Sequence, residues 1–222
     1  MSDWPERFVY TAIEGPIGVG KTSLARRLAE RTDAELVLEQ PMDNPFLARF
    51  YEDPRGAALP TQLHFLFQRA RQCQDMRQSD LFAPRRVSDF MLEKDRLFAQ
   101  LNLDNDELAL YDMVYDKLAI DAPPPDLVIY LQADVGTLKE RIRERGIAFE
   151  QSISEDYLRR LSDAYTRFFH HFSSAPLLIV NTQRSNFAAS DDALCGLIAQ
   201  IERLKSGRRF YNPAGDLPLQ GP

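Results

Sequence analysis

The sequence contains little that would suit a disulfide framework, a metal cluster or a membrane span. Its two cysteines, Cys73 and Cys195, and its three histidines are too few and too scattered for a disulfide scaffold or a His/Cys metal site. No apolar run approaches the roughly 20 residues that cross a membrane. Residues 1–7 lack the apolar core of a signal peptide. We therefore expect a cytoplasmic protein with no membrane partner.

An excess of positive charge is also absent. Lys and Arg number 27 against 33 Asp and Glu, which gives a formal net charge of −6. Sequence-independent binding to nucleic acid draws most of its affinity from a basic surface. We therefore expect no nucleic-acid partner. Hydrophobic residues make up 44% of the chain and charged residues 27%, which is typical of a globular domain.

Five short apolar segments alternate with stretches of helical periodicity. The expected strands are residues 8–13, 35–39, 86–90, 126–131 and 177–180. Strands separated by helices predict an α/β fold of three layers, in which a five-stranded parallel sheet is covered by helices on both faces. We expect residues 1–205 to form one domain and residues 206–222, which contain three prolines, to form a flexible tail.

A glycine-rich segment directly follows the first expected strand. Residues 15–22, Gly-Pro-Ile-Gly-Val-Gly-Lys-Thr, fit the pattern G-x-x-x-x-G-K-[ST], and a helix follows. Such glycines let backbone N–H groups converge on phosphate oxygens, and the helix adds its positive N-terminal end. Lys21 would reach the β- and γ-phosphates of ATP, and the Thr22 hydroxyl would hold Mg²⁺. The predicted ATP-binding residues are Gly15, Pro16, Ile17, Gly18, Val19, Gly20, Lys21, Thr22 and Ser23.

The phosphate-binding loop alone fits ATPases, GTPases and small-molecule kinases, but later motifs resemble the deoxynucleoside kinase family. These motifs are Glu39-Gln40-Pro41, Asn44-Pro45-Phe46-Leu47, Thr61-Gln62 with Arg69, Ser88-Asp89-Phe90, Glu93-Lys94-Asp95-Arg96, and residues 141–146. Their order and spacing resemble those of the bacterial deoxyadenosine, deoxyguanosine and deoxycytidine kinases over residues 8–182. The resemblance implies the fold of P-loop nucleoside and nucleotide kinases, a small lid over residues 141–153, and a homodimer. It also implies transfer of the γ-phosphate of ATP to the 5′-hydroxyl of a purine deoxynucleoside or deoxycytidine in nucleotide salvage.

Glu39 is the predicted catalytic base. It leaves a parallel strand at the carboxyl end, on the sheet edge where α/β proteins bind ligands. A carboxylate there can accept the 5′-hydroxyl proton during phosphoryl transfer. A glutamate that merely solvates the end of a strand is the alternative interpretation.

Gln62 and Arg69 lie seven residues apart, so they share one helical face, with Phe65 and Leu66 between them. Polar ends around an apolar middle suit a flat base, although two solvated residues on an amphipathic helix would give the same pattern. The resemblance adds Asp95 to the contacts with the base. It also assigns two residues to the sugar 3′-hydroxyl, Tyr51 and Glu150.

Arg141 and Arg145 are four residues apart on one helical face, where both would stabilise charge on the transferred phosphoryl group. Arg143 points elsewhere and is interpreted as a surface residue. Ile147 stands where the family often has a further lid arginine.

A second departure from the family pattern, besides Ile147, lies at the end of the third expected strand. Asp89 can still serve Mg²⁺, but Phe90 stands where the family often has an arginine. Lys94, Arg96 or Arg85 would have to supply the missing cation, and the sequence leaves these three open.

Three other functions are alternatives to the deoxynucleoside kinase hypothesis. A nucleoside monophosphate kinase, such as a thymidylate kinase, should offer extra arginines to the phosphate of its acceptor. Arg69 alone is fewer than such a site would need. A non-catalytic nucleotide switch would have no need of Glu39 or of the Gln62 and Arg69 pair. The acidic balance and small size disfavour an ATPase that processes nucleic acid.

Overall fold

The computed structural model describes residues 4–79, 85–118, 121–185 and 187–213. Their sheet has six parallel strands in the order β2-β3-β1-β4-β5-β6. The strands are β1 (Tyr10–Glu14), β2 (Glu35–Val37), β3 (Arg86–Ser88), β4 (Leu127–Gln132), β5 (Leu177–Asn181) and β6 (Arg208–Tyr211). The α-helices are α1 (Lys21–Thr32), α2 (Leu47–Glu52), α3 (Pro54–Ser79), α4 (Lys94–Asn102), α5 (Asn105–Leu118), α6 (Val135–Arg145), α7 (Glu155–His171) and α8 (Asp191–Arg203). Two short 3₁₀ helices, η1 (Pro41–Asp43) and η2 (Ala148–Ser152), complete the described elements.

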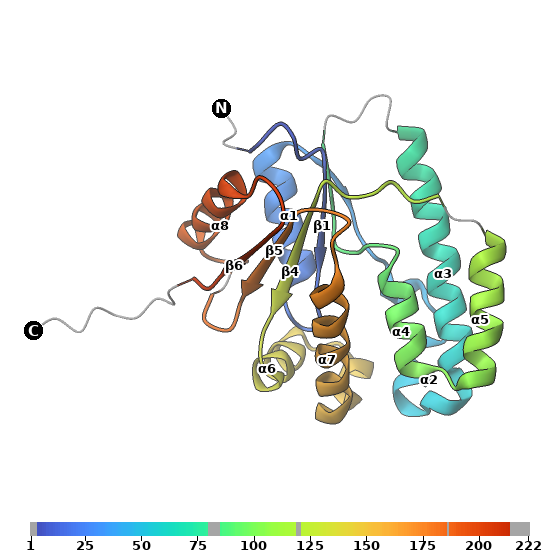
Figure 1. Cartoon of the computed structure of the whole chain (residues 1–222). Coiled ribbons are helices and arrows are strands. Elements are labelled where there is room, and N and C mark those ends of the chain that lie inside the picture. Colours follow the sequence, from blue (N-terminus) through green and yellow to red (C-terminus); the bar gives the residue numbers. More distant parts are fainter. Residues whose placement is uncertain (1–3, 80–84, 119–120, 186, 214–222) are drawn as a thin grey trace, which may run out of the picture.

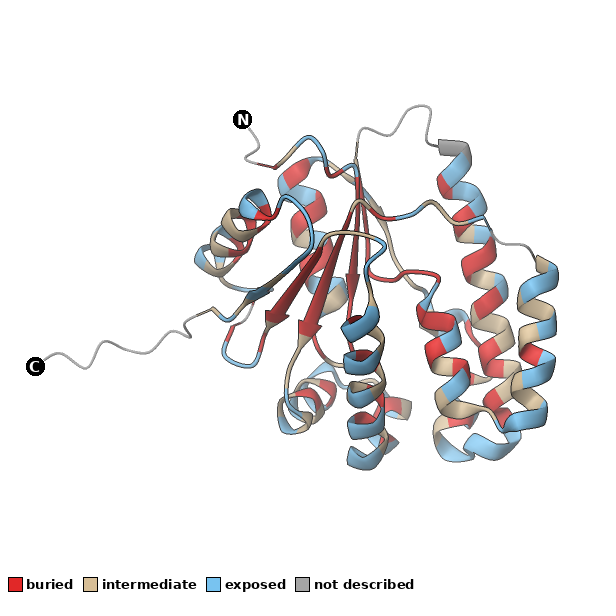
Figure 2. Cartoon of the chain, in the orientation of Figure 1, coloured by how far each residue is buried: buried red, intermediate tan, exposed pale blue. Residues whose placement is uncertain are grey.

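The central strands are buried on both faces (Figure 2). Because side chains alternate along a strand, Leu127, Ile129 and Leu131 of β4 pack in one hydrophobic cluster with α1 and α8, whereas Val128 and Tyr130 pack in another with α3, α4 and α7. The two clusters make the three layers that the sequence predicts. Figure 1 shows α1 and α8 on one side of the sheet and the group α2 to α5 on the other.

The sheet has six strands rather than the expected five, so the strand count from the sequence was wrong. The additional strand, β6, pairs with β5 inside the segment expected to be a tail. Its residues are Arg-Arg-Phe-Tyr, alternately exposed and half-buried, so it lacks the continuous apolar run that marks the inner strands. Residues 214–222 of the expected tail lie outside the described residues. No helix in the described ranges combines the length and apolar character needed to cross a membrane.

Candidate active site

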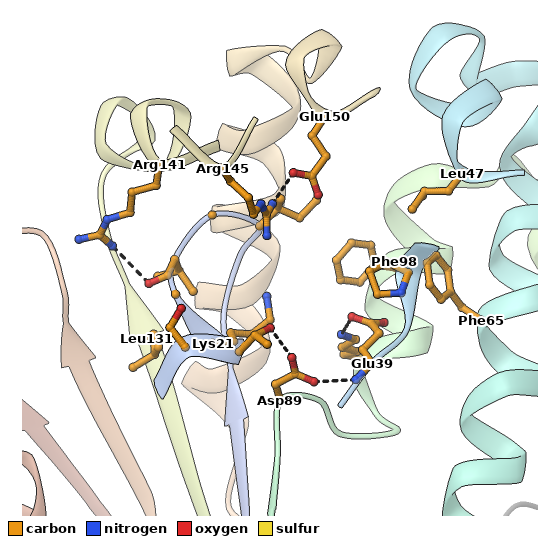
Figure 3. A pocket seen from close by; sticks show the side chains of 18 of the residues that line it. Lys21, Glu39, Leu47, Phe65, Asp89, Phe98, Leu131, Arg141, Arg145 and Glu150 are labelled. Atoms are coloured by element: carbon orange, nitrogen blue, oxygen red, sulfur yellow. Dashed lines mark hydrogen bonds and ion pairs between the residues drawn. The ribbon is translucent and has the colours of Figure 1, made fainter. Parts of the chain in front are cut away.

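A cleft of about 680 Å³ opens where the strands end at their carboxyl side. Its lining comes from the loop between β1 and α1, from the segment after β2, and from α2, α3, α4, α6 and η2. Figure 3 shows that Lys21, Asp89 and Glu39 lie on its floor, with Arg141, Arg145 and Glu150 above them. Topology explains the gathering, because parallel strands present their carboxyl ends at one edge of the sheet.

The loop of residues 15–20 depends on glycine for its shape. Gly15, Gly18 and Gly20 all have positive φ, at 145°, 84° and 102°. A Cβ at Gly18 would lie 2.7 Å from the carbonyl oxygen of Leu138, so this glycine also permits α6 to approach the loop. Gly20 caps α1 without a side-chain hydrogen bond, and the first turn of α1 holds no acidic residue. The first turn therefore keeps the backbone N–H groups and positive end that suit a phosphate.

Lys21 lies across this loop. Its Nζ donates to the carbonyl oxygens of Gly15 at 2.8 Å and Pro16 at 3.3 Å. Burial, followed by repulsion from Lys94, lowers the pKa of Lys21 to about 8. Anionic phosphates would oppose both effects, so the loop and its lysine fit the triphosphate of ATP.

Two predicted metal ligands are joined directly. The Thr22 hydroxyl donates to Oδ2 of Asp89 at 2.5 Å, while Oδ1 of Asp89 accepts from the backbone N–H of Glu39 at 2.8 Å. In the described part of the chain no three His, Cys, Asp or Glu residues form a metal cluster. A hydroxyl and a carboxylate beside a phosphate site fit Mg²⁺, which is usually bound by one or two protein oxygens, substrate phosphates and water.

The carboxylate of Glu39 is held from two helices. Its Oε2 accepts from Nζ of Lys94 at 2.8 Å, and its Oε1 forms an ion pair with Arg69, which also pairs with Asp95. Burial alone would raise the pKa of Glu39, but Lys94 and Arg69 outweigh it and lower the pKa to about 2. Glu39 therefore stays ionised at neutral pH and faces the cleft beside the phosphate-binding loop.

The residues predicted to bind a base come together on one side of Glu39. Gln62 and Arg69 line the cleft with Phe65, and Phe98 of α4 joins them. Asp95 lies behind Arg69 instead of on the cleft surface. Within the described residues, Oδ2 of Asp95 and Nε of Arg69 are buried and have no hydrogen-bond partner. The cleft surface here thus combines apolar rings with the polar side chains of Gln62 and Arg69, as a site for a flat base requires.

Tyr51 and Glu150 line the same cleft although they are far apart in the sequence. The ring of Tyr51 stacks on Phe149 with centroids 6.0 Å apart, and Glu150 accepts from Arg145 at 2.5 Å. Burial, then Tyr157 and Glu150, raise the pKa of Tyr51 well above its usual value. Burial likewise raises the pKa of Glu150. A neutral phenol and a carboxylate side by side can donate to and accept from one hydroxyl group.

The two lid arginines, Arg141 and Arg145, have different partners. Arg141 donates to the carbonyl oxygens of Val19 at 3.2 Å and Thr182 at 2.6 Å, which fastens α6 to the phosphate-binding loop. Arg145 is paired with Glu150 instead. Both line the cleft, whereas Arg143 is exposed outside it, as expected for a surface residue.

Sequence reasoning left the missing cation open among three residues and did not single out Glu14. Exposed Arg96 pairs with Asp112, and Arg85 donates to the carbonyl oxygen of Thr32, so only Lys94 of the three reaches the cleft. Phe90 is fully buried. Contacts across the fold, which a linear sequence does not reveal, make this distinction.

Glu14 ends β1 and is completely buried. Its carboxylate accepts from the backbone N–H groups of Met91 at 2.7 Å and Gly15 at 3.2 Å, and from the hydroxyl of Tyr165 at 3.0 Å. Burial raises the pKa of Glu14. In the sequence, the available signal was an acidic residue at the end of an apolar strand. Its contacts tie the phosphate-binding loop to the segment after β3 and to α7.

This fold and this cleft define a P-loop kinase that acts on a small acceptor. The sequence profile of the family described as deoxynucleoside kinase matches residues 11–205, and the chain belongs to that family. It is thus an enzyme, an ATP-dependent kinase of deoxynucleosides.

Curated relatives agree with this membership, and a solved structure shares the fold. A deoxyguanosine kinase of Bacillus subtilis is 35% identical over 159 residues, which cover 70% of this chain and 76% of the relative. A deoxyadenosine kinase of Lactobacillus acidophilus is 28% identical over 86% of this chain and 93% of its own length. The structure of a deoxyadenosine kinase from M. mycoides superposes with a TM-score of 0.73 at 22% identity, covering 86% of this chain and 97% of that one.

Proposed function

We propose that the enzyme transfers the γ-phosphate of ATP to the 5′-hydroxyl of a purine deoxynucleoside or deoxycytidine, in nucleotide salvage. The observation that carries the proposal is the placement of Glu39. An ionised carboxylate, paired with two cations, lies between a phosphate-binding loop and a pocket suited to a flat base. The same proposal includes a requirement for Mg²⁺, a homodimer and a cytoplasmic location.

The donor side rests on the loop and α1. The backbone N–H groups of residues 15–23 and Lys21 would hold the phosphates of ATP, and Thr22 and Asp89 would hold Mg²⁺. The bound metal would neutralise charge that develops on the phosphate oxygens. Arg145 would stabilise the transferred group from the lid, and Arg141 would keep α6 against the loop so that the lid excludes water.

The acceptor side orients the nucleoside. Gln62 and Arg69 would bind the base beside Phe65 and Phe98, with Asp95 holding Arg69 from behind the cleft surface, while Tyr51 and Glu150 would bind the 3′-hydroxyl. The 5′-hydroxyl would then donate a hydrogen bond to Glu39. With a pKa near 2, this carboxylate is a weak base at rest, so it would take the proton only as the new bond forms. Late proton transfer agrees with the loose transition state of phosphoryl transfer.

The acceptor is a nucleoside in this proposal because the nearby cations are already neutralised. Arg69 pairs with Glu39 and Asp95, Lys94 pairs with Glu39, and Arg145 pairs with Glu150. A second phosphate on the acceptor would meet carboxylates on this side of the cleft. Electrostatics therefore disfavour a monophosphate acceptor.

The test is ATP consumption with Mg²⁺ across the four deoxynucleosides and dTMP, with each product identified by mass. We expect a 5′-monophosphate from deoxyadenosine, deoxyguanosine or deoxycytidine. Phosphorylation of dTMP alone would contradict the proposal, as would ATP consumption that no acceptor increases. Sedimentation equilibrium would test the homodimer separately.

A further inference from the structure

Lys94 is a buried cation at the start of α4. Its side chain is 4% exposed, it lines the cleft, and its Nζ lies 2.8 Å from Oε2 of Glu39. Lysine is almost never fully buried unless it is paired, because removing an ammonium group from water is costly. The location of this pair, on the acceptor side of the phosphate-binding loop, indicates a use beyond stability.

The two oxygens of Glu39 have partners of different kinds. Oε1 is held by Arg69, which divides its guanidinium between Glu39 and Asp95 and faces the proposed base pocket. Oε2 is held by Lys94, and Glu39 is the acceptor of that ammonium group in the described part of the chain. A base that engages Arg69 would weaken the first contact. The second contact would persist.

The surroundings of Lys94 also place it between the base pocket and the reacting atoms. Its Nζ lies 5.9 Å from the ring centroid of Phe98, one helical turn further on, and Phe98 lines the cleft. On its other side, the charge of Lys94 contributes to the lowered pKa of Lys21 in the phosphate-binding loop. Lys94 is therefore close to both halves of the site.

We propose that Lys94 is a positioning residue for phosphoryl transfer, which holds the carboxylate of Glu39 toward the 5′-hydroxyl while Arg69 engages the base. This inference rests on the proposed function, in particular on Glu39 as the proton acceptor. Lys94 keeps its own proton throughout, and its effect on the reaction passes through Glu39.

A double-mutant cycle tests this role. The four chains are the wild type, Lys94→Met, Glu39→Gln and the double variant, with Arg96→Met as the control on the exposed face of the same helix. For Lys94→Met we expect kcat to fall roughly 10- to 150-fold, the range for losing a hydrogen bond to a charged group, with the KM for ATP unchanged. In the Glu39→Gln background the substitution of Lys94 should change kcat little, because the carboxylate that Lys94 positions is already absent. Arg96→Met should behave as the wild type.

Two results would overturn the role of Lys94: wild-type kcat in Lys94→Met, or an equal fold-loss of kcat in both backgrounds. Thermal melting separates loss of catalysis from loss of folding. If Lys94→Met does not fold, Lys94→Gln is the substitute: its neutral amide can still donate to Glu39, so kcat should fall less than in Lys94→Met, and again only in the background that keeps Glu39. A wild-type enzyme that phosphorylates no deoxynucleoside would instead refute the proposed function, and the role of Lys94 with it.

Discussion

The hydroxyl of Thr22 donates to Asp89 at 2.5 Å, which links the first turn of α1 to the end of β3. The same carboxylate binds the backbone N–H of Glu39, so one side chain connects the proposed metal site with the proposed catalytic base. A substitution of Asp89 should therefore affect both the donor and the acceptor side of the cleft.

Chelation of divalent metal should abolish turnover, and added Mg²⁺ should restore it. Asp89→Asn should raise the Mg²⁺ concentration needed for half-maximal activity, since an amide is a weaker ligand than a carboxylate. The amide oxygen can still accept from the N–H of Glu39, so the fold should persist. Activity titrated against Mg²⁺ measures the effect, with Asp112→Asn on the surface as the control. An unchanged Mg²⁺ requirement would remove Asp89 from the metal site.

Gly18 and Gly20 offer a matched pair in the phosphate-binding loop. Both have positive φ, but a Cβ at Gly18 would meet the backbone of Leu138 at 2.7 Å, whereas a Cβ at Gly20 would have nothing within 4 Å. Gly20→Ala should lower the free energy of unfolding by about 1–2 kcal/mol, the cost of left-handed backbone. Gly18→Ala should cost more, because α6 must also shift. Denaturant unfolding of the two variants checks the order, and equal losses would speak against the contact with α6.

Arg145 and Arg143 lie on different faces of α6, so they separate a lid function from simple surface charge. Arg145→Gln should lower kcat and kcat/KM together by roughly 10²-fold, the magnitude for losing one group that stabilises the transition state. Arg143→Gln should leave both near wild type, because this side chain is exposed outside the cleft. Steady-state kinetics with saturating ATP distinguish the two. Similar losses in both variants would argue for a long-range charge effect.

The two cysteines should differ sharply in reactivity. Cys73 is buried, and burial raises its pKa to about 11, while Cys195 is exposed. A thiol reagent at pH 8 should label one cysteine in the native enzyme and two in denaturant. The raised pKa also means that the native thiol keeps a proton that the unfolded chain releases from pH 9 upward. This contribution to stability is complete below pH 9 and is lost as pH rises through about 11. Loss of the pH dependence in Cys73→Ala would confirm its origin.

The sequence predicts the parts of this enzyme that are encoded locally. The pattern of residues 15–22 predicts the phosphate-binding loop almost completely, because each of its glycines adopts a positive φ. The inner strands are equally easy to predict from the sequence, because burial on both faces requires continuous apolar runs such as residues 127–131. Spacing along one helix correctly placed Gln62 and Arg69 together at the cleft.

The rest depends on contacts between distant segments. Nothing in the sequence around Lys94 says that it, and not Arg96, points toward Glu39, because that choice is set by how α4 packs against α3 and α7. The bonds from Arg141 to Val19 and Thr182 are equally invisible in a linear pattern. The strand β6 was missed because its stability comes from pairing with β5 and not from its own apolar content.

That last strand has a consequence for the solubility of the protein. The family match ends at residue 205, yet β6 lies beyond it, at Arg208–Tyr211. Without these residues β5, buried at four of its five positions, would become the rim of the sheet, with a row of open hydrogen-bonding groups along an apolar strand. Such a rim is a template for pairing with other chains. A chain cut at the family boundary would retain every predicted catalytic residue but lose its protection against self-association.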